Sequence, residues 1–186
     1  MLTKSKIITY IHLSFIVFLN IYVYQLIPAL TSNMSGLGNE YHHPLYLLLW
    51  AISCASFFMI HTKKVMTQYV YPFKIGKWLL YFFTILMIAS VVIPYQPISF
   101  PLLSKWHVRL SMLSTAGYII LFLHLICHQV FQQGNLKIHY LQFYVFFITL
   151  ELLLYILNGG VSTLLETTFV LIMSFYLLHL EKNTNP

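Results

Sequence analysis

The sequence contains few charged residues. Only 8% of its 186 residues are Asp, Glu, Lys or Arg, and none is Asp, whereas about a quarter of the residues in a soluble domain are charged. The two cysteines, Cys54 and Cys127, lie within apolar runs, which argues against a disulfide framework, a zinc ribbon or a CxxC redox motif. No GxGxxG or Walker-type loop is present, so we do not expect nucleotide-dependent chemistry in this chain.

Hydrophobic residues make up 59% of the chain and gather in long runs. A helix needs about 20 apolar residues to cross the hydrocarbon core of a membrane, and the runs lack the period-two alternation of transmembrane strands. The sequence therefore predicts an all-α, polytopic integral membrane protein, a six-helix transmembrane bundle that forms a single domain over residues 1–186. The six predicted spans are residues 7–30, 44–60, 76–93, 106–131, 140–157 and 161–180.

The connections between the predicted spans are short. Three prolines, Pro94, Pro97 and Pro101, separate the third span from the fourth, where they end helices. Only Asn158, Gly159 and Gly160 separate the fifth span from the sixth. This spacing predicts a tight helical hairpin and two antiparallel neighbouring helices.

The basic residues predict the orientation of the bundle, because Lys and Arg in short loops stay on the cytoplasmic side. With six spans, only Lys105 and Arg109 fall near the outer side. We therefore predict a plasma-membrane protein with both termini in the cytoplasm. The net charge of +6 is then mainly a topology signal with some attraction to anionic lipid headgroups, and nucleic acid is not an expected partner. The basic residues on the predicted cytoplasmic side are Lys4, Lys6, Lys63, Lys64, Lys74, Lys77, Lys137 and Lys182.

Glutamate, histidine and tyrosine side chains gather in the outer half of the predicted bundle. Glu151 lies six residues before the end of the fifth span and Glu166 about six residues into the sixth, so both carboxyls are expected about 9 Å below the outer boundary. His107 and Tyr118 lie on one face of the fourth span, and Tyr155 follows Glu151 at helical spacing. Ionisable groups in hydrocarbon usually face the bundle interior. We therefore predict an outward-facing Glu/His/Tyr pocket; the structural alternative is that the carboxyls hold helices together.

Three histidines near the outer boundary are candidates for a metal site. His42 and His43 end the first outer loop, and His107 opens the fourth span. Three such ligands together with a glutamate would suit Zn²⁺. Exposed loop histidines are the structural alternative for His42 and His43.

Other histidines lie at the predicted cytoplasmic ends. His124, Cys127 and His128 form an H-x-x-C-H run with both histidines on one helix face. A b-type haem would need axial histidines from two helices, and His12 or His61 facing His124 or His128 would supply them. Interfacial packing of amphipathic imidazoles near helix C-termini is the competing interpretation.

Two short motifs resemble a known group of membrane proteins. The segment M-S-G-L-G-N-E-Y-H-H-P-L-Y precedes the second span, and K-W-H-V-R-L-S opens the fourth. This arrangement is similar to the Frag/DRAM/Sfk group of six-span proteins and their uncharacterised bacterial relatives, with Ser35, Leu37 and Gly38 matching the first element and His107 the second. Gly36 stands where an acidic residue is commoner in that group. The resemblance covers the first four spans and implies a membrane protein connected with lipid or glycolipid handling.

The sequence thus favours a small multipass protein that binds or handles a lipid or small amphiphile in an outward-facing pocket, with membrane lipids as partners and no required cofactor. Its candidate ligand-binding residues are Glu151, Glu166, His107, Tyr118 and Tyr155. The alternatives are an intramembrane metal-dependent hydrolase with Zn²⁺ at His42, His43 and His107, and an electron carrier with haem b. Whether the protein is an enzyme stays open, since no catalytic set is identified.

Overall fold

The computed structural model of the protein describes residues 4–133 and 138–182, so that Lys137 lies outside the described residues. Within these ranges the chain is entirely helical, and six of the helices are long and apolar enough to cross a membrane. The predicted fold class is therefore confirmed. The helices are α1 (Lys4–Tyr22), the short 3-10 helix η1 (Val23–Gln25), α2 (Met34–Asn39), α3 (Pro44–Gln68), α4 (Lys74–Val92), α5 (Pro101–Gln133), α6 (Ile138–Leu157) and α7 (Thr163–Lys182).

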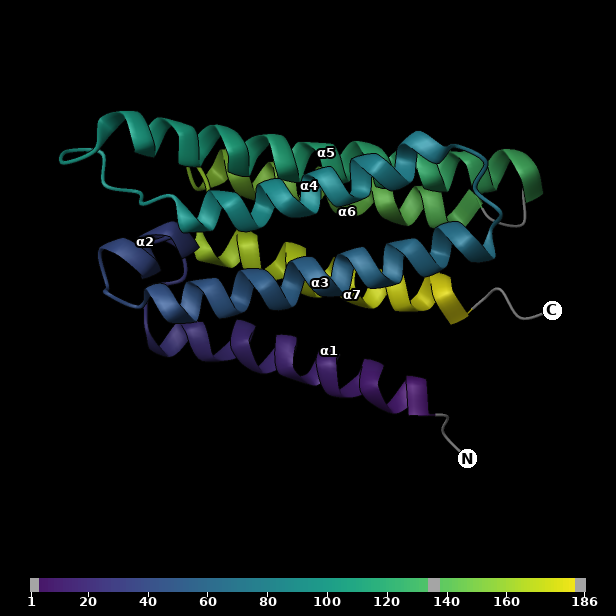
Figure 1. Ribbon diagram of the computed structural model, residues 1–186, viewed down its shortest axis with the longest axis horizontal. Helices are drawn as coiled ribbons and strands as arrows, with labels where there is room; N and C mark the ends of the chain where they lie inside the picture. The colour runs from purple at the N-terminus through teal and green to yellow at the C-terminus, as the bar shows by residue number, and fades with distance from the viewer. Residues whose placement is uncertain (1–3, 134–137, 183–186) are drawn as a thin grey trace.

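The six long helices lie side by side with their axes roughly aligned (Figure 1). Helix α3 packs against α1, α4 and α7, while α5 packs against α4 and α6. Buried aromatic and aliphatic side chains, including Phe57 and Phe58 of α3, Leu80 of α4 and Phe122 of α5, form the core between them. Apolar side chains on the outside of the bundle are exposed, as expected for surfaces that face lipid.

The two ends of the bundle differ. Both chain ends and the connection between α3 and α4 lie at one end, whereas α2 and the connections α4–α5 and α6–α7 lie at the other (Figure 1). We call these the terminal end and the α2 end. This arrangement is the one expected from six consecutive spans.

The main differences from the sequence-based prediction are four. Helix α5 begins at Pro101 instead of residue 106, since proline suits the first position of a helix; Pro101 therefore opens this helix and does not lie in the connection. Helix α1 ends at Tyr22 and η1 follows, so the predicted span to residue 30 is too long; Pro28 lacks the N–H that a continuing helix needs. Helix α3 extends to Gln68 instead of residue 60, because Lys63 and Lys64 can continue a helix while their charged ends leave the apolar region. The fourth difference is α2, which lies within the predicted first outer loop.

Helix α2 is only six residues long and contains two glycines, so it has no periodic signal in the sequence. It forms because the Asn33 side chain accepts a hydrogen bond from the backbone N–H of Gly36 at 2.8 Å, which caps the first turn. Met34 and Leu37 are buried on its inner side. Helix α2 therefore belongs to the packed structure, and it packs against α3.

The predicted hairpin between the last two helices is confirmed. Gly159 and Gly160 have φ angles of 69° and 156°, a left-handed region that glycine adopts without strain. Asn158 donates a side-chain hydrogen bond to the Ser162 hydroxyl at 2.9 Å, which closes the turn. Helices α6 and α7 are consequently packed neighbours.

Candidate functional site

Glu166 joins α7 to α2 at the α2 end. Its Oε2 atom accepts a hydrogen bond of 2.7 Å from the backbone N–H of Met34, the first residue of α2. This N–H has no intrahelical acceptor, and a carboxylate at a helix N-terminus is also favoured by the helix dipole. Glu166 therefore anchors α2.

His107 of α5 reaches α2 from another side. Its Nδ1 atom lies 2.9 Å from the carbonyl oxygen of Ile93, and its Nε2 atom lies 2.7 Å from the Ser35 hydroxyl. Since a carbonyl only accepts hydrogen bonds, Nδ1 carries a proton, while Nε2 shares a hydrogen bond with the Ser35 hydroxyl. Both ring nitrogens are thus used within the protein.

Backbone and hydroxyl contacts complete this end. The Thr163 N–H and hydroxyl both donate to the Ser32 carbonyl, at 2.7 and 2.9 Å, and the Tyr24 hydroxyl hydrogen-bonds to that of Thr167. The Asn39 side chain accepts a hydrogen bond of 3.2 Å from the Tyr95 N–H. The polar residues of the α2 end therefore make a network that holds α2 and its flanking loops across the bundle.

Glu151 does not share this network. It is 6% exposed, and neither of its carboxyl oxygens has a hydrogen-bond partner among the described residues. Thr168 of α7 is the polar side chain beside it, but its hydroxyl donates to the Leu164 carbonyl of its own helix at 2.8 Å. Thr168 and Glu166 are two residues, about 200°, apart around α7. The two carboxyls therefore face different sides of α7.

The expected matching depth of the two carboxyls also changes. Helix α7 begins at Thr163, so Glu166 lies in its first turn, nearer the helix end than the sequence indicated. Glu151 remains six residues before the end of α6 at Leu157. The two groups are not brought together in one cavity.

The two tyrosines of the predicted pocket also lie apart. Tyr118 is buried, its hydroxyl is 2.5 Å from that of Thr84 on α4, and its ring lies 6.0 Å from that of Phe58. Tyr155 is 43% exposed on the outer surface of α6. Of the five predicted ligand-binding residues, only Glu166 and His107 meet a common element, α2.

The three histidines proposed for Zn²⁺ do not converge. His42 and His43 are exposed, while His107 is turned inward with both nitrogens hydrogen-bonded. Among the residues that the structure describes, no group of three His, Cys, Asp or Glu side chains could hold a metal ion. The geometry therefore does not provide the zinc site that the sequence suggested.

The histidines proposed for a haem form two separate clusters. The rings of His12 and His61 contact Phe57, with centroid distances of 5.2 and 4.2 Å. The rings of His124 and His128 instead contact Tyr71, with centroid distances of 5.7 and 5.4 Å. Interfacial packing, the competing interpretation of these residues, accounts for these contacts.

Protein groups also occupy one nitrogen of three of these rings. His12 lies 3.0 Å from the Ser53 carbonyl oxygen. The Tyr71 hydroxyl lies 2.7 Å from Nδ1 of His124, within hydrogen-bonding distance. The third is His61, whose partner is a carboxylate.

The terminal end also contains a charged cluster that was not predicted from the sequence. Glu181 of α7 places Oε2 at 2.6 Å from Nδ1 of the buried His61 and Oε1 at 3.1 Å from Nζ of Lys64. Glu181 is the one acid on the predicted basic side of the chain. An isolated acid among basic residues indicates an ion pair, but Glu181 lies far from α3 in the sequence, so its partners His61 and Lys64 could not be identified.

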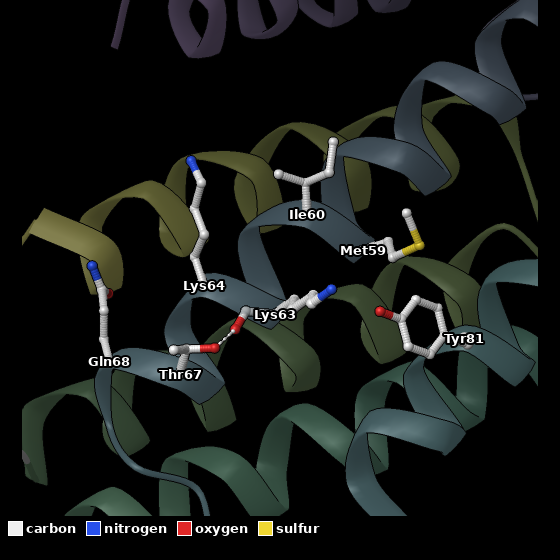
Figure 2. A pocket seen from close by; sticks show the side chains of 7 residues that line it. All are labelled: Met59, Ile60, Lys63, Lys64, Thr67, Gln68 and Tyr81. Carbon is white, nitrogen blue, oxygen red and sulfur yellow. Dashed lines mark hydrogen bonds between the residues drawn. The ribbon is translucent and has the colours of Figure 1, made fainter. Parts of the chain in front are cut away.

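Beside this cluster lies a groove of about 470 Å³, which we call the basic groove. Lys63 of α3 extends toward Tyr81 of α4 (Figure 2), with Nζ 5.7 Å from the centre of the ring, a cation–π contact. Lys64 projects from the neighbouring position of α3 (Figure 2). The groove is lined by Met59, Ile60, Lys63, Lys64, Thr67, Gln68 and Tyr81.

A second, more apolar groove of about 220 Å³ lies between α4 and α5. Gly117 forms part of its wall. The ring of Phe83 occupies the space that a side chain at this position would need, since a Cβ at Gly117 would lie 2.2 Å from Cε1 of Phe83. His124 and Tyr71 line the same groove. Both grooves thus border α4 toward the terminal end.

Comparison with known proteins yields no relative: no protein-family model matches the chain, and no curated protein or solved structure is significantly similar to it.

Proposed function

We propose that the protein binds anionic membrane lipids, with the headgroup in the basic groove. The observation that carries the proposal is that two adjacent lysines, Lys63 and Lys64, line one groove with the apolar side chains of Met59 and Ile60. Basic pockets between transmembrane helices recognise anionic headgroups in this way. The proposal keeps the lipid ligand expected from the sequence but moves its site to the other end of the bundle.

The groove has the order of groups that a lipid requires. Met59 and Ile60 lie on the side of the bundle centre, and Ile60 is exposed. Lys63 and Lys64 follow one turn later along α3, toward its terminal end. A phospholipid whose phosphate meets the lysines would therefore direct its acyl chains along the apolar surface of α3 and α4.

The lysines retain hydrogen-bonding capacity for a phosphate. Lys63 contacts the face of the Tyr81 ring, which accepts no conventional hydrogen bond from it. Lys64 is partly exposed and donates to Glu181, and a lysine ammonium carries three donors. Each therefore has at least one N–H to offer to an anion.

The topology supports the same site. Lysine-rich connections favour the cytoplasmic side, so we propose that the terminal end, and with it the basic groove, faces the anionic cytoplasmic leaflet of the plasma membrane. The short motifs that resemble Frag/DRAM/Sfk proteins agree with a role in lipid handling.

Native mass spectrometry of the full-length protein, titrated with phosphatidylglycerol or phosphatidylcholine of identical acyl chains, tests the proposal. We expect phosphatidylglycerol to bind more tightly, and the double variant Lys63→Gln/Lys64→Gln to lose at least about fivefold in its affinity, from roughly 1 kcal/mol for each lysine that the headgroup engages. The matched control is Lys74→Gln/Lys77→Gln, which removes two exposed lysines of α4 that do not line the groove. Equal binding of the two lipids by the unmodified protein would refute the proposal.

A further inference from the structure

We infer that the basic groove selects phosphomonoester headgroups over phosphodiester headgroups, and that Glu181 sets this selectivity. The inference rests on the proposed function and adds the class of ligand. Its structural basis is the position of Glu181, whose carboxylate already holds one of the two groove lysines.

Within the described part of the chain, only one of the two groove lysines is paired with a carboxylate. Lys63 and Lys64 contribute two positive charges, and Glu181 lies 3.1 Å from Nζ of Lys64. Lys63 instead lies over an aromatic ring, that of Tyr81, with Nζ 5.7 Å from the ring centre. An incoming anion therefore meets Lys63 first and competes with Glu181 for Lys64.

The competition depends on the charge of the headgroup. A phosphodiester carries a single negative charge, which Lys63 matches, so it gains little by also drawing Lys64 from Glu181. A phosphomonoester carries about −1.5 to −2 at pH 7 and has three terminal oxygens. It can engage Lys63 and Lys64 together, and its second charge compensates the loss of the Lys64–Glu181 contact.

His61 continues to hold Glu181 when Lys64 moves. Its Nδ1 atom lies 2.6 Å from Oε2 of Glu181, on the opposite oxygen from Lys64. His61 is buried. Besides Glu181 and Lys64, His12 of α1 is the ionisable group that interacts electrostatically with the His61 imidazole. Removing a partner from a partly buried carboxylate is unfavourable, so the hydrogen bond that His61 keeps with Glu181 favours the exchange of Lys64.

Neutral donors around the groove suit the additional phosphate oxygen. The Tyr81 hydroxyl lies beside Lys63 (Figure 2), and the Gln68 amide supplies two further N–H groups. Thr67 does not add a donor, because its hydroxyl donates to the Lys63 carbonyl at 2.8 Å. The groove lining thus contains two ammonium groups and two neutral donors, with Tyr81 on the side of Lys63 and Gln68 at the opposite end of the groove (Figure 2).

The test compares phosphatidate, phosphatidylglycerol and phosphatidylcholine of identical acyl chains in nanodiscs that contain the full-length protein. For the unmodified protein we expect phosphatidate to bind about fivefold more tightly than phosphatidylglycerol, the effect of one additional lysine contact. Glu181→Gln releases Lys64 and is expected to strengthen phosphatidylglycerol binding until the two lipids differ by less than about twofold. Glu40→Gln, at an exposed acid of the α2 end, is the matched control and should change neither affinity.

A second variant keeps the inference testable if Glu181→Gln does not fold. Lys64→Gln should bring phosphatidate affinity down to that of phosphatidylglycerol while leaving phosphatidylglycerol binding nearly unchanged. Lys63→Gln should weaken both lipids. Equal weakening of both lipids by Lys64→Gln would overturn the role assigned to Glu181.

The outcomes separate the two levels of the proposal. If all three lipids bind equally, lipid binding at the groove fails as a whole. If phosphatidate and phosphatidylglycerol bind equally and more tightly than phosphatidylcholine, only the selectivity fails. Glycerol 3-phosphate and inorganic phosphate provide the soluble arm: competition by either at the concentration that phosphatidate needs would identify a free phosphomonoester as the ligand and overturn the lipid assignment.

Discussion

The carboxylate of Glu166 accepts a hydrogen bond of 2.7 Å from the backbone N–H of Met34, a residue 132 positions earlier in the chain. The last helix of the bundle thereby holds the first turn of a helix that is too short to be stable in isolation. The α2 end of the protein thus depends on a contact between distant parts of the sequence.

Glu166→Ala should destabilise the protein, because it leaves the Met34 N–H without its acceptor. An unsatisfied polar group of this kind costs about 1–3 kcal/mol, measurable as a fall in the free energy of unfolding in detergent. Glu166→Gln retains an amide oxygen as acceptor and should lose less. Glu40→Ala, at the exposed acid nearby, should have almost no effect, and equal stability of all three variants would show that the anchor contributes nothing.

The bond between His107 and Ser35 links α5 to α2. A double-mutant cycle with His107→Phe and Ser35→Ala should give a coupling energy of about 0.5–1.5 kcal/mol, the usual contribution of one hydrogen bond. Additive effects of the two substitutions on unfolding would mean that the contact has no energetic weight. His107→Phe alone should cost more than Ser35→Ala, because it also orphans the Ile93 carbonyl.

Glu151 is the buried carboxyl for which the described structure provides no hydrogen bond. A buried polar group without a partner is costly, and replacing it with an apolar side chain of similar size is often stabilising. We therefore expect Glu151→Met to raise the free energy of unfolding by about 1–3 kcal/mol. Thr149→Val, at an exposed position of the same helix, is the control and should stay within roughly 0.5 kcal/mol. Strong destabilisation by Glu151→Met would instead show that the carboxyl stabilises the bundle.

Gly117 allows α4 and α5 to approach closely. A methyl group there would overlap the ring of Phe83, so Gly117→Ala should destabilise the bundle by about 1–3 kcal/mol. Phe83→Leu should recover part of this loss in the double variant, because the smaller side chain vacates the space. Gly36→Ala is the comparison: its Cβ would come no closer than 3.6 Å to another atom, and its effect on unfolding should be smaller.

The composition of the chain was sufficient to predict the membrane bundle. Long apolar runs separated by Pro, Gly and Lys are typical of transmembrane helices joined by short connections. The turn at Asn158–Gly160 could be predicted from these three residues alone. Helix α2 could not be predicted from the sequence, because its six residues include too few apolar positions to show a helical period. It is also held by Glu166 and His107, which come from distant segments.

Side-chain convergence was harder to predict than helix positions. The approximate depth of Glu151 and Glu166 in the bundle followed from counting residues. The direction in which each side chain points depends on the neighbours of its helix. Glu166 points to α2, whereas Glu151 lies beside Thr168 of α7. Glu181 was missed for the same reason: its pairing with His61 and Lys64 joins the end of α7 to α3. Such pairings require knowledge of the helix order in the bundle.

The orientation of the bundle can be tested with two exposed positions at opposite ends. Val70 follows α3 at the terminal end and is 79% exposed, and Ile98 lies between α4 and α5 at the α2 end and is 98% exposed. In a Cys54→Ala/Cys127→Ala background, Ile98→Cys should react with a membrane-impermeant maleimide on intact cells. Val70→Cys should react only after the cells are permeabilised. The reverse pattern would place the basic groove on the outer leaflet, where the argument from anionic cytoplasmic lipid no longer applies.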